Sequence, residues 1–202
     1  KKIIADGGEV HLVGRDAKSL SELASELDSS FTTCDVLEEN FSEKIFNDLG
    51  DTPINGLAYC VGSIDLKPIK MTKKSDFMQS FNLNLVSATE IIRRSSDSLK
   101  QNKGSIVLFS TVAVRRGFTN HSIVASAKGA LEGLTVSLAA EFAPNIRVNC
   151  IAPSLTKSTA SYRLITTRTP TDSHRLMPDV KRIAVAKKNR DSYKGEDAAA
   201  IC

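Results

Sequence analysis

Residues 104–153, GSIVLFSTVAVRRGFTNHSIVASAKGALEGLTVSLAAEFAPNIRVNCIAP, decide the fold of this 202-residue chain. Ile106–Phe109 is a short apolar run followed by Ser110 and Thr111, which is typical of a buried parallel strand with hydroxyls at its carboxyl end. Ser122–Phe142 contains no proline, and its apolar residues recur near the helical period. A second apolar run closes the stretch. The pattern predicts a strand, a polar loop, a long helix and another strand.

The predicted helix carries one lysine, Lys128, on its apolar face. Lys128 follows Val124 by four residues and precedes Leu131 by three, so the three side chains share one face. A lysine in this position usually packs its stem and extends its amine into water, because unpaired lysines are almost never fully buried. The alternative is that the amine serves a functional site. The local pattern leaves both interpretations open.

The order of the motifs resembles the short-chain dehydrogenase/reductase family. In that family a strand ending in Ser–Ser, a Tyr-x-x-x-Lys helix and an Arg-Val-Asn-x-Ile-x-Pro-Gly strand follow one another. The matching residues here are Ser110–Thr111, Val124-x-x-x-Lys128 and residues 147–154, RVNCIAPS. The resemblance implies an α/β fold with a doubly wound parallel sheet, a Rossmann-like three-layer sandwich formed by residues 1–202 as a single, incomplete domain.

The resemblance also implies a chemistry, hydride transfer between a nicotinamide cofactor and a carbonyl carbon. In the family a tyrosine supplies the proton, the lysine lowers the pKa of that tyrosine and binds the nicotinamide ribose, and a serine polarises the carbonyl. By resemblance Lys128 keeps the lysine roles, and Thr111 takes the serine position with Ser110 beside it. Asn84 takes the position of an asparagine that holds the lysine through water. Val124 replaces the tyrosine and cannot donate a proton.

The missing tyrosine leaves the proton donor open. His121, three residues before Val124, is one candidate, with a helix cap or a surface residue as the alternative interpretation. A water held by Lys128 and Asn84 is another. Some family members that reduce conjugated enoyl thioesters also lack a tyrosine at this spacing. The predicted activity is therefore an oxidoreductase acting on a carbonyl or conjugated enoyl substrate, and the alternative is a catalytically degenerate nucleotide-binding or structural module.

Two earlier strands supply candidate cofactor-binding residues. Arg15 follows a predicted strand at Glu9–Gly14, where a basic side chain would pair with a ribose 2′-phosphate. This favours NADP(H), and the neighbouring Asp16 keeps NAD(H) as the alternative. Asp35 follows a predicted strand at Phe31–Cys34, and the resemblance places it against the adenine amino group. A turn residue similar to an N-cap is its other interpretation.

The next predicted strand, Ile54–Cys60, leads to Gly62. This glycine is the one residue kept from the family's Asn-Asn-Ala-Gly segment, and it lets the backbone pass close to a cofactor. Tyr59 stands at the first asparagine and is either a phenol near the cofactor or a buried strand tyrosine. Beyond residue 154, Thr156 and Ser158 are candidates for binding the cofactor carboxamide.

Helices are predicted at about Ala17–Leu27, at about Asn40–Leu49, and as one or two segments between Lys74 and about Leu99. Lys1–Asp6 is predicted to be the end of a helix, because Gly7 and Gly8 follow it as a stop signal. In the family, a strand and a glycine-rich turn that binds the pyrophosphate precede this helix. We therefore expect that N-terminal strand and turn to be missing from the sequence.

Composition narrows the class of protein. The chain is 41% hydrophobic and 25% charged, ordinary for a globular protein, and its formal charge of +4 is accompanied by no aromatic-basic platform for nucleic acid. No apolar run approaches the roughly 20 residues of a membrane span. The four cysteines show no metal-ligand spacing and are predicted to be reduced, three of them in the core of a cytoplasmic protein.

The remaining expectations concern substrate and assembly. Residues 158–194 are polar and basic and match the family's substrate-loop region, which predicts a mobile loop and, as a weaker alternative, a lid over an anionic substrate. The substrate is expected to be a small molecule. Family members form dimers and tetramers through the helices near residues 75–99 and 122–142, so the resemblance implies a homodimer or homotetramer.

Overall fold

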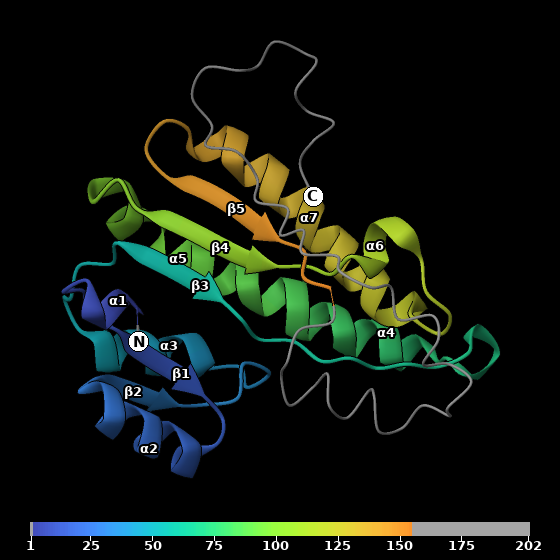
Figure 1. Ribbon diagram of the computed structural model, residues 1–202, viewed down its shortest axis with the longest axis horizontal. Helices are drawn as coiled ribbons and strands as arrows, with labels where there is room; N and C mark the ends of the chain where they lie inside the picture. The colour runs from blue at the N-terminus through green and yellow to red at the C-terminus, as the bar shows by residue number, and fades with distance from the viewer. Residues whose placement is uncertain (1, 155–202) are drawn as a thin grey trace.

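The computed structural model describes residues 2–154. Strands and helices alternate along most of this part of the chain (Figure 1). The strands are β1 (His11–Gly14), β2 (Ser30–Thr33), β3 (Gly56–Tyr59), β4 (Ser105–Phe109) and β5 (Arg147–Ile151). The helices are α1 (Lys2–Ala5), α2 (Ala17–Leu27), α3 (Phe41–Leu49), η1 (Ile69–Met71), α4 (Lys74–Phe81), η2 (Asn82–Val86), α5 (Ser87–Gln101), α6 (Ala113–Arg116) and α7 (Ser122–Phe142).

Every strand pair is parallel, as predicted. β1 pairs with β2, and β4 lies between β3 and β5, where Leu108 is opposite Tyr59 on one side and Cys150 on the other. Among the described residues no ladder of hydrogen bonds joins β1 to β3, so the strands form a two-stranded and a three-stranded sheet. The predicted α/β fold is confirmed, with its sheet in two parts.

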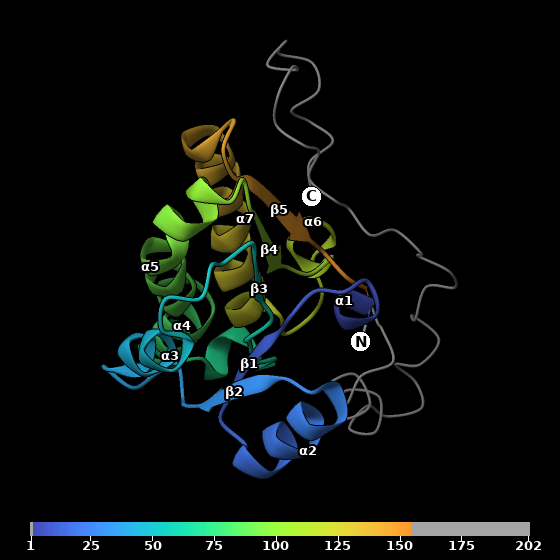
Figure 2. The same ribbon diagram turned by 90° about the vertical axis from the view of Figure 1, so that its left-hand side faces the viewer.

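The helices cover the sheets in layers. Helices α3, α4, α5 and α7 lie on one side of the strands, and α1 and α2 lie on the other (Figure 2). The main core packs alternate residues of β3, β4 and β5 against α5 and α7. Its fully buried members include Leu99, Ile106, Leu108 and Leu131. This core fixes α7 against the sheet, and α7 carries Lys128.

Helix α7 spans the predicted residues. It ends where Ala143, the residue before Pro144, takes an extended conformation. By length and composition alone this helix could cross a membrane. In the structure it packs on β4 and β5, and its Ile123 and Ala127 are completely buried. Its apolar character is therefore accounted for by the core of the α/β fold.

The predicted helix between Lys74 and Leu99 is two α-helices joined by one π-helical turn, η2. A π turn holds one extra residue and displaces carbonyls from the regular helical ladder. Here Ser87 Oγ lies 2.7 Å from the carbonyl oxygen of Asn82 and 2.9 Å from that of Leu83. The turn brings Asn84, which is completely buried, onto the face directed at the core.

Strands β1 and β3 are shorter than predicted, and the early end of β3 concerns Cys60. The third strand ends at Tyr59, and Cys60 follows it as an exposed free thiol, so its prediction as a core residue is wrong. Its position just past the end of the strand accounts for the exposure. Cys34 and Cys150 are buried, as predicted.

Candidate functional site

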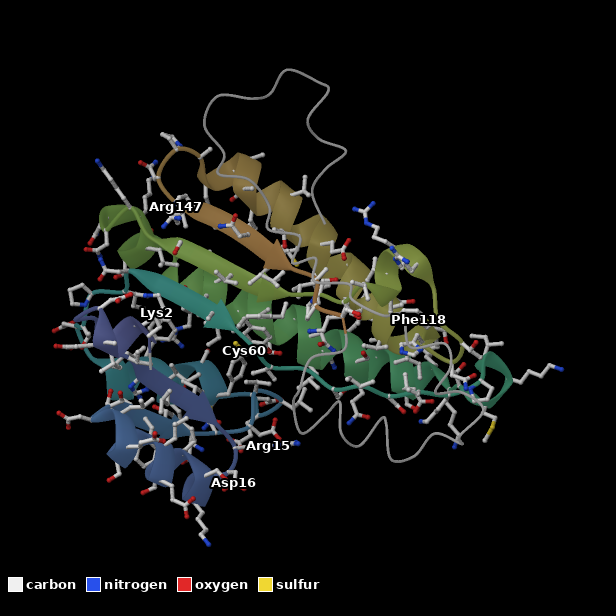
Figure 3. The ribbon with its side chains drawn as sticks, viewed as in Figure 1. Lys2, Arg15, Asp16, Cys60, Phe118 and Arg147 are labelled. Carbon is white, nitrogen blue, oxygen red and sulfur yellow. The ribbon has the colours of Figure 1, made fainter. Side chains whose placement is uncertain are left out.

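The candidate residues lie where the parallel strands end. Arg15 follows β1, Cys60 follows β3, and Ser110 with Thr111 follows β4. In Figure 3 Arg15 and Cys60 lie at the carboxyl end of their strands, whereas Arg147 marks the opposite edge, where β5 begins. Ligands of open α/β sheets bind outside the carboxyl ends of the strands. The predicted site residues are therefore placed on the expected edge.

Lys128 is the most unusual charged group in this region. The residue is only 8% exposed, so most of its side chain is withdrawn from water. Burial lowers the pKa of Lys128 from its ordinary value of 10.5 to about 8, while the thiols of Cys150 and Cys60 act in the opposite direction. A buried amine with this pKa exchanges its proton more readily near neutral pH than a surface lysine does.

Gly62 and Asn84 meet Lys128 at one point. A Cβ atom on Gly62 would lie 2.8 Å from Asn84 Oδ1 and 3.0 Å from Lys128 Nζ. The absence of a side chain at Gly62 therefore allows the amide and the amine to approach the backbone. The structure brings together three residues that are 22 and 44 positions apart in the sequence, as the resemblance implied.

Asn84 has one satisfied and one unsatisfied side-chain group. Its Nδ2 donates a hydrogen bond of 2.8 Å to the carbonyl oxygen of Ser80, whereas Oδ1 has no hydrogen-bond partner among the described residues. A buried polar atom normally has a partner. Oδ1 therefore offers an acceptor for a donor beside it, either the Lys128 ammonium or a bound hydroxyl or water.

Ser110 and Thr111 have different surroundings. Ser110 Oγ donates a 2.6 Å hydrogen bond to Glu132 Oε1, and Arg115 Nε lies 3.3 Å from the other carboxylate oxygen of Glu132. The Ser110 hydrogen is thus committed to a buried carboxylate. Thr111 Oγ1 accepts a 3.3 Å bond from the amide of Ala113, which does not use the hydroxyl hydrogen. Of the two, Thr111 is the better placed to polarise a carbonyl.

No local pattern in the sequence singles out Glu132. A glutamate on a helix is ordinarily a surface residue, yet the side chain of Glu132 is only 7% exposed. Its pairing with Ser110 and Arg115 accounts for the burial, because buried charges require partners. Neither partner is close to Glu132 in sequence, so the network becomes visible only in three dimensions.

His121 is at the start of α7, as predicted, with its imidazole turned back to the preceding loop. Nδ1 lies 2.7 Å from the carbonyl oxygen of Thr119, and the ring contacts Phe118 edge-on with centroids 5.4 Å apart. The residue lines a hollow of about 630 Å³ formed by the loop around Pro68, the segment from Ala113 to Ser122, and Ala125. It is not among the residues that meet at Gly62.

Tyr59 has a structural environment. The residue is 5% exposed, its hydroxyl donates a 2.8 Å bond to the carbonyl oxygen of Leu83, and burial raises the pKa of Tyr59 to about 12. An acid this weak, with its proton already engaged, is a poor donor to a substrate. The buried strand tyrosine is the interpretation that fits.

The residues predicted to bind adenosine lie together after β1 and β2. Arg15 Nη1 is 3.8 Å from Asp35 Oδ2, and the Arg15 side chain is 81% exposed. Asp16 caps α2 by accepting a 2.9 Å bond from the amide of Ser19, and Asp35 Oδ1 accepts a 3.0 Å bond from the amide of Leu37. The turn role foreseen for Asp35 is confirmed. Thr156, Ser158 and the 158–194 segment lie outside the described residues.

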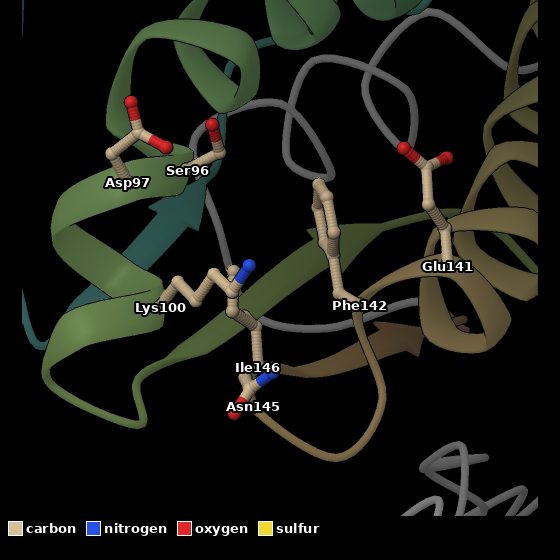
Figure 4. A pocket seen from close by; sticks show the side chains of 7 residues that line it. All are labelled: Ser96, Asp97, Lys100, Glu141, Phe142, Asn145 and Ile146. Atoms are coloured by element: carbon tan, nitrogen blue, oxygen red, sulfur yellow. The ribbon is translucent and has the colours of Figure 1, made fainter.

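A second hollow lies at the other edge of the sheet, between the ends of α5 and α7 (Figure 4). Its volume is about 250 Å³, and Phe142 stands between Lys100 and Glu141 in the close view. It contains none of the predicted site residues. The candidate catalytic side chains lie instead at the carboxyl ends of the strands, around Lys128.

Parallel strands, flanking helices and polar groups gathered at the carboxyl edge define a Rossmann-like α/β protein. Residues 1–188 match a protein-family model described as Enoyl-(Acyl carrier protein) reductase. The chain belongs to the short-chain dehydrogenase/reductase family.

Curated relatives carry the names of reductases. The chain is 33% identical to an L-xylulose reductase of Mesocricetus auratus over 75% of this chain and 63% of the relative. A human L-xylulose reductase is 29% identical, covering 88% and 75%, and a tropinone reductase homolog of Arabidopsis thaliana is 31% identical, covering 79% and 64%. The chain thus spans somewhat under two thirds of the first of these relatives.

Solved structures support the fold. A short chain dehydrogenase/reductase family protein superposes with a TM-score of 0.75 at 24% identity, covering 82% of this chain and 72% of the other. A short chain dehydrogenase from Shigella flexneri, complexed with NADP, gives a TM-score of 0.73 at 23% identity, covering 82% and 74%. At these identities the likeness concerns the fold alone.

Proposed function

We propose that this protein is an NADP(H)-dependent oxidoreductase that transfers a hydride to or from a carbonyl or conjugated enoyl substrate. The observation that carries the proposal is the convergence of Gly62, Asn84 and Lys128, where a buried amine and an unsatisfied amide oxygen flank a backbone without a side chain. Membership of an oxidoreductase family and the reductase names of the relatives support it.

The described residues fit a nicotinamide cofactor. The absence of a side chain at Gly62 lets Asn84 and Lys128 lie against the backbone there, and Lys128 would hold the hydroxyls of the nicotinamide ribose. Arg15 would pair with a 2′-phosphate, and Asp35 would accept from the adenine amino group. Asp16 gives one carboxylate oxygen to the cap of α2, whereas the exposed Arg15 guanidinium would be available to a 2′-phosphate, so we favour NADP(H) over NAD(H). When bound, the reduced cofactor supplies the hydride.

The proton follows a route that does not need a tyrosine. Thr111 donates a hydrogen bond to the substrate oxygen, and Lys128 supplies the one proton that this oxygen takes up, directly or through a water bound at Asn84 Oδ1. The pKa of Lys128, lowered by burial to about 8, matches this role because a general acid works best near the operating pH. His121 remains an alternative donor.

A second candidate function follows from Val124. This residue is 4% exposed, and it stands one helical turn before Lys128, where the family has its proton donor. General acid–base assistance is worth roughly 10²–10⁴-fold in rate. A chain that binds the nucleotide without turnover, a degenerate binding or structural module, would keep Lys128 for the ribose and lose the chemistry.

The proposal extends to assembly and location. Helices α5 and α7 are those through which the family associates, and Val136 of α7 is 45% exposed. A homodimer or homotetramer would cover exposed apolar side chains on these helices. The proposed location is the cytoplasm. Sedimentation of the purified protein measures the oligomeric state directly.

The test of function is a turnover assay with the full-length protein. NADPH oxidation is followed with a panel of sugar-like ketones, aryl ketones and enoyl thioesters, for the wild type and for Lys128→Met. Substrate-dependent oxidation that falls at least about 100-fold in Lys128→Met is expected, in keeping with loss of the proton source and of a ribose contact. Nucleotide binding without oxidation of NADPH by any compound would favour the degenerate module.

A further inference from the structure

The end of β3 and the π-helical turn are joined by one side chain, that of Tyr59. Its hydroxyl lies 2.8 Å from the Leu83 carbonyl oxygen and 2.8 Å from Ser87 Oγ. Ser87 Oγ in turn lies within 2.9 Å of the carbonyl oxygens of Asn82 and Leu83. Two side-chain hydroxyls therefore lie against the two carbonyl groups at the point where the helix widens, and the Asn82 carbonyl also accepts from the backbone N–H of Ser87.

The hydroxyl contacts support the widened turn. A π turn replaces the regular hydrogen bonds by longer-range ones, and additional donors at its carbonyl oxygens stabilise it. Tyr59 reaches Leu83 from a strand that lies on the other side of the core. This contact comes from outside the helix, so it fixes the turn relative to the sheet.

Asn84 is the residue next to Leu83. Its Nδ2 is held by the carbonyl oxygen of Ser80, and its unsatisfied Oδ1 points at the space over Gly62, where Lys128 Nζ also lies. Gly62 follows Tyr59 by three residues. Tyr59 is thus linked to both sides of the site. It is linked to Gly62 through the backbone and to Asn84 through the hydrogen bond to the Leu83 carbonyl oxygen.

We propose that Tyr59 is a positioning residue, which fixes the π-helical turn through Leu83 and thereby holds Asn84 Oδ1 toward Lys128 and Gly62. Its catalytic meaning rests on the proposed function, whereas the positioning itself does not. The competing account is that Tyr59 only fills the core, where its ring packs in the cluster that contains Ile92 and Leu108. Tyr59→Phe keeps the ring and removes the hydroxyl, so it separates the two accounts.

The first readout is the side-chain amide of Asn84 in a ¹⁵N-labelled protein, assigned from the signal lost in Asn84→Asp. We expect Tyr59→Phe to shift this signal and to raise its hydrogen-exchange rate by about tenfold or more, because the turn opens locally more often. The matched control is Ser95→Ala, which removes another buried hydroxyl, bonded to the Ile91 carbonyl oxygen within α5. Its Asn84 signal should coincide with that of the wild type.

The second readout is turnover. Tyr59→Phe is expected to lower kcat by about tenfold with little change in the KM of the substrate, because the amide acts on the lysine rather than on substrate binding. An Asn84 signal in Tyr59→Phe that matches the wild type in shift and exchange overturns the proposal. If Tyr59→Phe does not fold, Ser87→Ala, which removes the other hydroxyl, is read in the same way.

The two readouts fail separately. The amide signal requires neither cofactor nor substrate, so a perturbed signal in a protein without turnover would retain the positioning role and reject the proposed function. An unperturbed signal in a protein that turns over would do the reverse.

Discussion

Lys128 and Arg15 are both cations placed near the carboxyl ends of parallel strands, and their surroundings are opposite. Lys128 is 8% exposed, and its amine lies beside an unsatisfied amide oxygen. The Arg15 side chain is 81% exposed and lies 3.8 Å from a carboxylate that also caps a turn. Exposed pairs of this kind contribute about 0–1 kcal/mol, whereas groups in a buried site act on one another strongly.

The difference in exposure between Lys128 and Arg15 indicates that the two cations have different functions in the fold. The buried cation is tied to the geometry of three segments, β3, η2 and α7, and small changes there should alter chemistry. The exposed cation is tied to a ligand outside the fold, and its loss should alter affinity for that ligand while leaving the fold intact. Substitutions in the two regions therefore test different parts of the account.

The largest effect is expected for Val124→Tyr in the buried region. A phenol one turn before Lys128 would restore a proton donor, and turnover should rise by roughly 10²–10⁴-fold for a carbonyl substrate. Val124→Phe supplies the same ring without the hydroxyl and should give no gain. The measurement is kcat from NADPH oxidation. A gain with both variants would show that bulk, rather than the proton, is what the site lacks.

The next effect concerns stability. The folded-state pKa of Lys128 is about 8 against 10.5, so between these values the unfolded chain binds more protons and the free energy of unfolding rises with pH. Relative to Lys128→Met, which has no such titration, the wild type should gain up to about 3 kcal/mol across this window. Urea unfolding between pH 7.5 and 10.5 measures it.

A constant difference between the two proteins over this pH range would contradict the burial of the amine. Lys100→Met, which removes an exposed lysine at the opposite edge of the sheet, is the control and should show no such trend.

A smaller effect is expected for Gly62→Ala. The new Cβ would lie 2.8 Å from Asn84 Oδ1 and 3.0 Å from Lys128 Nζ, so both groups must move. We expect kcat/KM to fall by about tenfold or more, since misplaced catalytic groups lose rate steeply. Gly56→Ala at the start of β3 is the control, because its nearest contact would be an ordinary 3.9 Å. Equal effects of the two variants would show that the loss does not depend on the contacts with Asn84 and Lys128.

The smallest effect on stability is expected for a substitution of the exposed Arg15. Arg15→Ala should change the free energy of unfolding by less than about 0.5 kcal/mol. Its Kd for NADPH should rise by about tenfold, with that for NADH unchanged, because only the former carries the 2′-phosphate. Fluorescence titrations measure both constants. Equal weakening for the two nucleotides would remove the basis for preferring NADP(H).

Local patterns predicted much of this fold and less of its site. The spans of α2 and α7 agree with the predicted ones, because periodicity and the absence of proline are encoded within each helix. The burial of Lys128 was left open by periodicity, which places a side chain on a face but does not say how deep that face lies. Only the order of the surrounding motifs favoured a functional role.

Two features could not be read from neighbouring residues. The π-helical turn depends on the Tyr59 hydroxyl, which comes from a strand 24 residues before Leu83. The Ser110 hydroxyl hydrogen is engaged by the carboxylate of Glu132, a residue of α7 that lies 22 positions later in the sequence. Both are contacts between segments, and such contacts decide which of several plausible hydroxyls remains available for chemistry.

The most direct test of the central claim, that Gly62, Asn84 and Lys128 form a cofactor site, is a titration with NADPH followed by nicotinamide fluorescence. The full-length wild type and Lys128→Met are compared under identical conditions. We expect the wild type to bind NADPH at submillimolar concentration and Lys128→Met to bind at least about tenfold more weakly, a loss of about 1.4 kcal/mol. Equal affinity of the two proteins, or no binding of NADPH or NADH at millimolar concentration, would contradict the account.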